Sequence, residues 1–76
     1  MKRKRYVAID VDGNIIGFSC ANEPRRDDFG EQGQRYIAFI GPFRTRRAQF
    51  WAMKYGKSNP HFRTVDDAER LSKLAD

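Results

Sequence analysis

The chain has 76 residues, of which 39% are hydrophobic and 33% are charged, so it is long enough for one small globular domain and too short for most enzyme folds. Fifteen Lys and Arg residues against ten Asp and Glu residues give a net charge of +5, which favours an anionic partner. A single Cys and a single His exclude an intrachain disulfide and a zinc cluster of the usual spacing.

The chain begins with a basic segment. Residues 1–5 contain Lys2, Arg3, Lys4 and Arg5, and we expect them to form a flexible arm that follows a phosphate backbone. The apolar stretch after them is too short for the hydrophobic region of an export signal or for a membrane span. These features predict a cytoplasmic protein that does not contact membranes.

Two strands joined by a tight turn are expected next. Residues 6–12 alternate between two sets of side chains in the period of a half-buried strand. The Asp-Gly-Asn run at residues 12–14 tolerates the positive φ values of a hairpin turn. Residues 15–20 then form the returning strand.

A long polar segment separates these strands from a third one. Residues 21–34 contain one Pro, two Gly and six charged residues, and we expect an exposed loop there. The third strand is expected at residues 36–40, where the Gly-Pro pair at residues 41–42 closes it.

A helix is expected over residues 46–55, with Thr45 as its N-cap. Gly56 is placed to end it in a left-handed conformation. One stripe of this helix is apolar and should pack on the sheet: Ala48, Trp51, Ala52 and Tyr55.

A second helix begins near Thr64, with Asp67 completing a capping box. Its apolar face is short and consists of Ala68, Leu71, Leu74 and Ala75. Three strands followed by two helices predict an α+β domain in which a small antiparallel three-stranded sheet carries both helices on one face. Residues 6–76 would form this single domain.

The strongest candidate site is the basic centre of the chain. Residues 35–63 hold seven Lys and Arg residues and no acidic residue. Guanidinium groups beside a helix N-terminus suit phosphate oxygens, because both offer several donors to an anion, and interleaved aromatic rings allow base stacking. The candidate nucleic-acid-binding residues are Arg44, Arg46, Arg47, Lys54 and Lys57, assisted by the basic arm. The alternative is that the aromatic residues form the core and the cations a solvated surface.

Phe50 and Met53 fall on the far side of the first helix. If they are exposed together, they favour a second hypothesis, in which the helix docks on a host protein. Such a face would also permit a homodimer as well as a monomer.

One motif suggests catalysis. Residues 8–16, with the sequence AIDVDGNII, resemble the first motif of haloacid-dehalogenase-type phosphatases, in which two carboxylates, here Asp10 and Asp12, act at a magnesium ion. A hairpin turn explains the same residues, and the chain has no room for a parallel sheet with its crossover helices. His61 has no partner suited to catalysis. We therefore expect a non-enzymatic protein with no catalytic residue, metal or cofactor.

Three weaker resemblances concern the second half of the chain. Residues 39–48, FIGPFRTRRA, resemble the strand-to-helix turn of three-stranded-sheet-plus-helix DNA-binding domains, such as plant ethylene-response factors and the arm-binding domains of tyrosine recombinases. They also resemble the turn of the glycan-binding sporulation-related repeat. The wider pattern, PFRT at 42–45, NPH at 59–61 and DAERL at 67–71, is similar to small phage and prophage proteins. That last likeness implies a host-cell setting and a nucleic-acid or host-protein partner.

Overall fold

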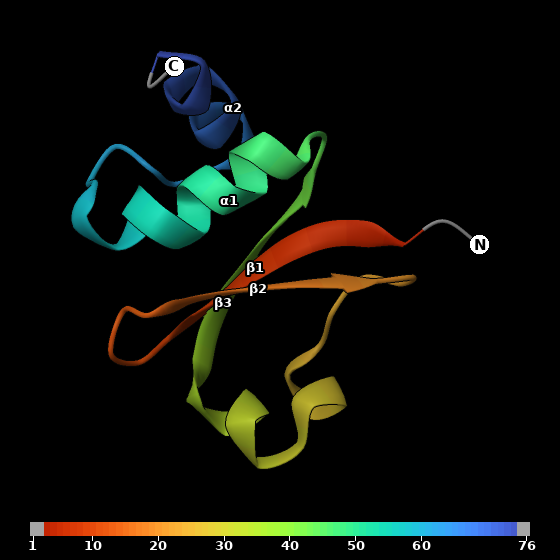
Figure 1. Cartoon of the computed structure of the whole chain (residues 1–76). Coiled ribbons are helices and arrows are strands. Elements are labelled where there is room, and N and C mark those ends of the chain that lie inside the picture. Colours follow the sequence, from red (N-terminus) through yellow and green to blue (C-terminus); the bar gives the residue numbers. More distant parts are fainter. Residues whose placement is uncertain (1–2, 75–76) are drawn as a thin grey trace.

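The structure, a computed structural model, describes residues 3–74. Its strands are β1 (Lys4–Asp10), β2 (Ile15–Cys20) and β3 (Tyr36–Phe43), and its helices are the 3₁₀ segments η1 (Arg26–Arg35) and η2 (Gly56–Ser58) and the α-helices α1 (Arg46–Tyr55) and α2 (Val65–Leu74). The strands form an antiparallel sheet in the order β2-β1-β3 (Figure 1). The α+β class and the strand-then-helix order are confirmed.

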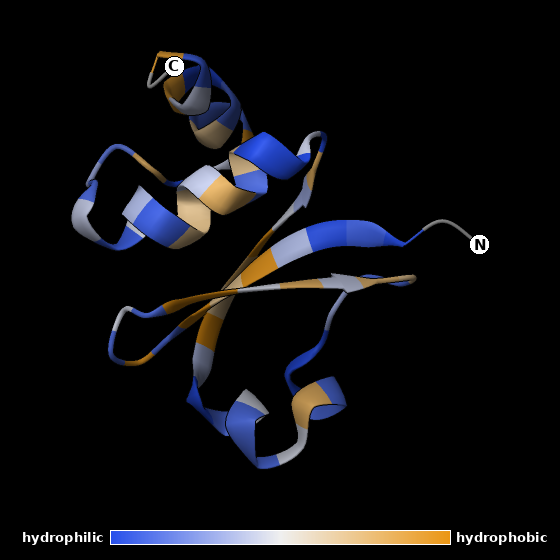
Figure 2. Cartoon of the chain, viewed as in Figure 1, coloured by the Kyte–Doolittle hydropathy of each residue, from blue (hydrophilic) through white to orange (hydrophobic). Residues whose placement is uncertain are grey.

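The main core lies between α1 and the sheet. Helix α1 packs on β1 and β2, and α2 packs on α1 and on the edge strand β3. Figure 2 shows the most hydrophobic part of the sheet at its centre, below α1. The buried residues of this core are Val7, Phe43, Ala48, Trp51, Ala52, Phe62 and Ala68.

The opposite face of the sheet is covered by η1, which lies on the other side of the sheet from α1 in Figure 1. Phe29 of η1 stacks with Phe39 and contacts Phe18 edge to face, with ring centroids 5.7 Å and 5.0 Å apart respectively. Together with Tyr6 and Tyr36 these rings form the aromatic cluster. The expected loop at residues 21–34 is therefore mostly exposed, but from Arg26 on it forms η1, and its one aromatic residue anchors it to the sheet.

Strand β1 both starts and ends earlier than the expected residues 6–12, because residues 11–12 belong to the turn. Lys4 pairs with Cys20, and Arg5 pairs with Ser19, so these two basic residues belong to the sheet and not to a flexible arm. The physical reason is that β2 extends to Cys20 and offers backbone partners to both. Lys2 lies outside the described residues.

Strand β3 continues through Gly41 and Pro42 to Phe43, although the Gly-Pro pair was expected to close it. The register with β1 shifts between Arg5 and Val7. Proline is tolerated at such an irregularity on an edge strand, because it has no N–H to donate to a ladder.

Both expected helix caps are confirmed. The Thr45 Oγ1 atom accepts a hydrogen bond from the Ala48 amide at 3.1 Å, and the Thr64 Oγ1 atom accepts one from Asp67 at 3.2 Å. The role expected for Gly56 was wrong, since its φ is −60° and the chain continues into η2. A Cβ atom there would lie 2.7 Å from Ile15 Cδ1, so close packing explains the glycine.

The apolar stripes differ from expectation at two positions. Tyr55 is 44% exposed, whereas Gln49 is buried on α1. On α2, Leu74 is 75% exposed and Ser72 is buried in its place; Ala75 lies outside the described residues. No helix within residues 3–74 has the length and apolar character needed to cross a membrane.

Candidate nucleic-acid interface

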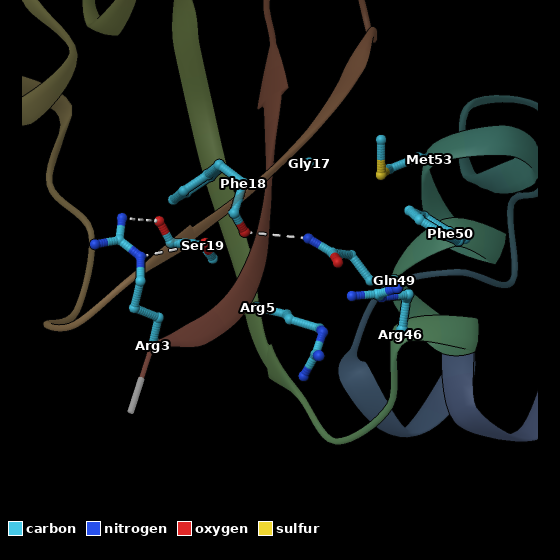
Figure 3. A pocket seen from close by; sticks show the side chains of 9 residues that line it. All are labelled: Arg3, Arg5, Gly17, Phe18, Ser19, Arg46, Gln49, Phe50 and Met53. Atoms are coloured by element: carbon cyan, nitrogen blue, oxygen red, sulfur yellow. Dashed lines mark hydrogen bonds between the residues drawn. The ribbon is translucent and has the colours of Figure 1, made fainter. Parts of the chain in front are cut away.

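A hollow of about 410 Å³ opens between α1 and the strands β1 and β2. We call it the β–α hollow (Figure 3). Three arginines line it: Arg3, which directly precedes β1, Arg5 near the start of β1, and Arg46 at the start of α1. Among residues 3–74, no acidic side chain lines this hollow. Its remaining lining residues are Gly17, Phe18, Ser19, Gln49, Phe50 and Met53.

Arg3 is fixed at the rim of the hollow by β2. Its Nη2 atom donates to the Ser19 carbonyl oxygen at 2.8 Å, and its Nε atom donates to Ser19 Oγ at 3.4 Å. Two contacts from one guanidinium restrict its orientation, and its remaining N–H groups can still meet an anion. Arg3 is therefore a positioned cation of the sheet edge.

Gln49 holds α1 against the sheet behind the hollow. Its Nε2 atom donates to the carbonyl oxygens of Tyr6 at 3.0 Å and Phe18 at 3.1 Å. One buried amide thus joins α1 to both β1 and β2. This contact fixes where Arg46, one turn earlier on α1, stands relative to Arg5.

The apolar wall of the hollow consists of Phe50 and Met53. Phe50 is 56% exposed and Met53 is 39% exposed, so the two residues are exposed together. Met53 lies over Gly17, where an added Cβ atom would come within 2.2 Å of its sulfur. The glycine lets Met53 approach β2 and line the hollow.

A second hollow of about 500 Å³ lies between α1 and α2, and we call it the α1–α2 hollow. Arg46, Phe50, Arg47 and Lys54 all line it. Lys54 stands 5.3 Å above the Tyr55 ring. Because Phe50 and Arg46 line both hollows, they form the ridge between them. We define the basic surface as Arg3, Arg5, Arg46, Arg47 and Lys54.

Three sequence-predicted cations do not join this surface. Arg44 lies 3.8 Å from a carboxylate oxygen of Asp66 on α2, and Lys57 donates to Asn14 Oδ1 in the β1–β2 turn at 2.9 Å. Lys4 alternates with Arg3 and Arg5 along the chain and therefore points to the other face of the sheet.

The two carboxylates of the phosphatase-like motif serve the turn. Asp10 is buried and accepts hydrogen bonds from the backbone amides of Asp12 and Asn14, both at 2.9 Å. Burial alone would raise the pKa of Asp10, but these hydrogen bonds to the charged form outweigh it and the pKa is lowered. Asp12 instead pairs with Arg35. Gly13 has the positive φ, 83°, that the turn requires.

The sequence did not predict several residues of the site. Gln49 carries no sequence signal, because its partners are backbone carbonyls. For Gly17 and Ser19, the sequence pattern predicts only a position in a strand. Arg3 and Arg5 were expected to assist as a mobile arm, and only the β1–α1 packing places them opposite Arg46, which lies more than forty positions away in the sequence.

None of the protein-family models, curated proteins or solved structures compared with the chain matches it. The likenesses to DNA-binding domains and phage proteins are therefore still predictions.

Proposed function

We propose that the protein is a non-enzymatic domain that binds nucleic acid, mainly through phosphate contacts from the basic surface. The observation that supports this most strongly is that Arg3, Arg5 and Arg46 line one hollow that no acidic side chain among residues 3–74 lines. Neither Arg5 nor Arg46 has a carboxylate within ion-pair distance among residues 3–74. Because Arg5 and Arg46 line the same hollow, their charges repel each other, and a polyanion relieves that repulsion.

The charges in the first turns of the two α-helices differ, and this difference supports the same proposal. Helix α2 has Asp66 and Asp67 in its first turn and Lys73 in its last, which matches the helix dipole. Helix α1 has no acidic residue in its first turn and carries Arg46 and Arg47 there instead. Cations at the positive end of a helix dipole are unfavourable for folding. Such unfavourable placements are expected at functional sites, where binding requires them.

The remaining surface is less basic. Segment η1, on the opposite face of the sheet, carries exposed Asp27, Asp28 and Glu31 against exposed Arg26 and Arg35. A molecule with unlike faces orients itself as it approaches a charged partner. The basic surface is thus the face that would meet nucleic acid first.

Charge reversal at Arg46 tests the proposal. We expect Arg46→Glu to weaken binding of labelled DNA, measured by fluorescence anisotropy, and to lower the slope of log affinity against log salt by about one or more. Arg25→Glu is the matched control, because it changes the net charge equally and lies at the start of η1. Unchanged far-UV circular dichroism of both variants shows that the fold is kept. Equal effects of the two variants would contradict the proposal.

A host protein is the second candidate partner. The shared exposure of Phe50 and Met53 favours it, because an apolar pair ringed by arginines is a common composition for the centre of a protein interface. A phage origin and a cytoplasmic location are compatible with either partner, nucleic acid or protein. Absence of binding to any nucleic acid at low salt would favour the protein partner.

A further inference from the structure

We propose that the basic surface binds single-stranded nucleic acid, with an unpaired base stacked on Phe50 and the flanking phosphates held by Arg5 and Arg46. This inference rests on the proposed function and names the form of nucleic acid that the site takes.

Phe50 is placed where a base can reach it. Its ring is 56% exposed and lines both the β–α hollow and the α1–α2 hollow. A phosphate gains nothing from an apolar ring, so contact with a duplex backbone alone leaves this ring unused. An unpaired base has a free π-face that stacks on aromatic side chains.

The spacing along α1 fits a strand that crosses the ridge. Arg46 precedes Phe50 by four positions, and Lys54 follows it by four. Positions four apart lie on the same side of a helix, about 6 Å apart along its axis. A strand laid along α1 therefore meets a cation, an aromatic ring and a second cation in turn.

The β–α hollow provides the second wall of such a site. Arg5 faces Arg46 and Phe50 across it (Figure 3), and Met53 extends its apolar wall. A volume of about 410 Å³ is within the range of small-molecule pockets, about 300 to 1,000 Å³. The hollow therefore has room for a base or a sugar-phosphate unit beside the ring.

The surroundings of α1 disfavour a duplex. Helices that read duplex DNA enter the major groove, and this requires a helix that projects from the protein. Here α1 is flanked by the sheet on one side and by α2 on the other (Figure 1). Only a stripe of α1 is open, which suits a flexible strand better than a rigid groove.

The test compares three labelled probes of about 12 nucleotides: a thymidine strand, a strand of the same length without bases, and a duplex. Wild-type protein should bind the thymidine strand most tightly. Phe50→Ala should weaken binding of that strand about tenfold and leave the other two affinities unchanged. Phe50→Tyr, which keeps the ring, should bind as the wild type does. Ile37→Ala is the matched control, because Ile37 is 66% exposed and lies on β3, away from both hollows.

The outcomes separate this inference from the proposed function. A preference for the duplex, or an equal effect of Phe50→Ala on all three probes, would overturn the single-strand assignment and leave phosphate binding intact. If no probe binds the wild-type protein at low salt, both the assignment and the proposed function fail.

Discussion

Gln49 is the residue on which the geometry of the candidate interface depends most. Its polar side chain is 7% exposed. From α1 it donates hydrogen bonds to the carbonyl oxygens of both Tyr6 and Phe18. A buried amide that makes two hydrogen bonds aligns the elements it joins. The position of Arg46 relative to Arg5 depends on this contact.

We expect Gln49→Ala to lower the free energy of unfolding by about 2 kcal/mol, because it removes two buried hydrogen bonds between α1 and the sheet and the packing of the side chain. Urea denaturation followed by circular dichroism measures the effect. Gln34→Ala, at an exposed position of η1, should change stability by less than about 0.5 kcal/mol. Equal effects of the two substitutions would show that the Gln49 hydrogen bonds contribute little.

At the scale of elements, η1 shows how a polar segment becomes part of the fold. Only Phe29 among its side chains enters the aromatic cluster, where it contacts Phe18, Tyr36 and Phe39. The rings of that cluster shield the sheet face opposite α1. Because one side chain supplies most of the apolar contact, the docking of η1 depends on it.

Phe29→Ala should therefore release η1 from the sheet. We expect a loss of about 2 kcal/mol in stability, smaller than for a fully buried Phe because the ring is partly exposed. Hydrogen exchange followed by mass spectrometry should show faster exchange in peptides of η1 than in peptides of α1. Phe50→Ala serves as the control, since it removes an exposed ring and should leave exchange in η1 unchanged. Uniform acceleration along the whole chain would instead indicate that η1 opens only with global unfolding.

At the scale of the molecule, the features that the sequence could predict are those that depend on residues close together in the chain. The turn at Gly13 and the helix cap at Thr45 depend on neighbouring residues, and both are confirmed. The alternation of a half-buried strand is not, because β1 is the central strand and Tyr6, Val7 and Ala8 are all buried. The docking of η1 through Phe29 depends on tertiary packing, which has no periodic signature. For the same reason the sequence grouped Arg44 and Lys57 with Arg46, although the structure directs them to Asp66 and Asn14.

The whole molecule thus has two unlike sides. On one side of the sheet, α1 carries the basic surface with Phe50 at its ridge. On the other, η1 covers the aromatic cluster and carries both acidic and basic side chains. We propose that nucleic acid occupies only the first side.

Chemical-shift mapping tests this claim most directly. Uniformly ¹⁵N-labelled protein is titrated with an unlabelled thymidine strand of about 12 nucleotides, and the backbone amide shifts are followed. We predict perturbations at Arg5, Gly17, Arg46 and Phe50, with none across η1. Perturbations centred on η1, or none at saturating strand concentration and low salt, would contradict the account.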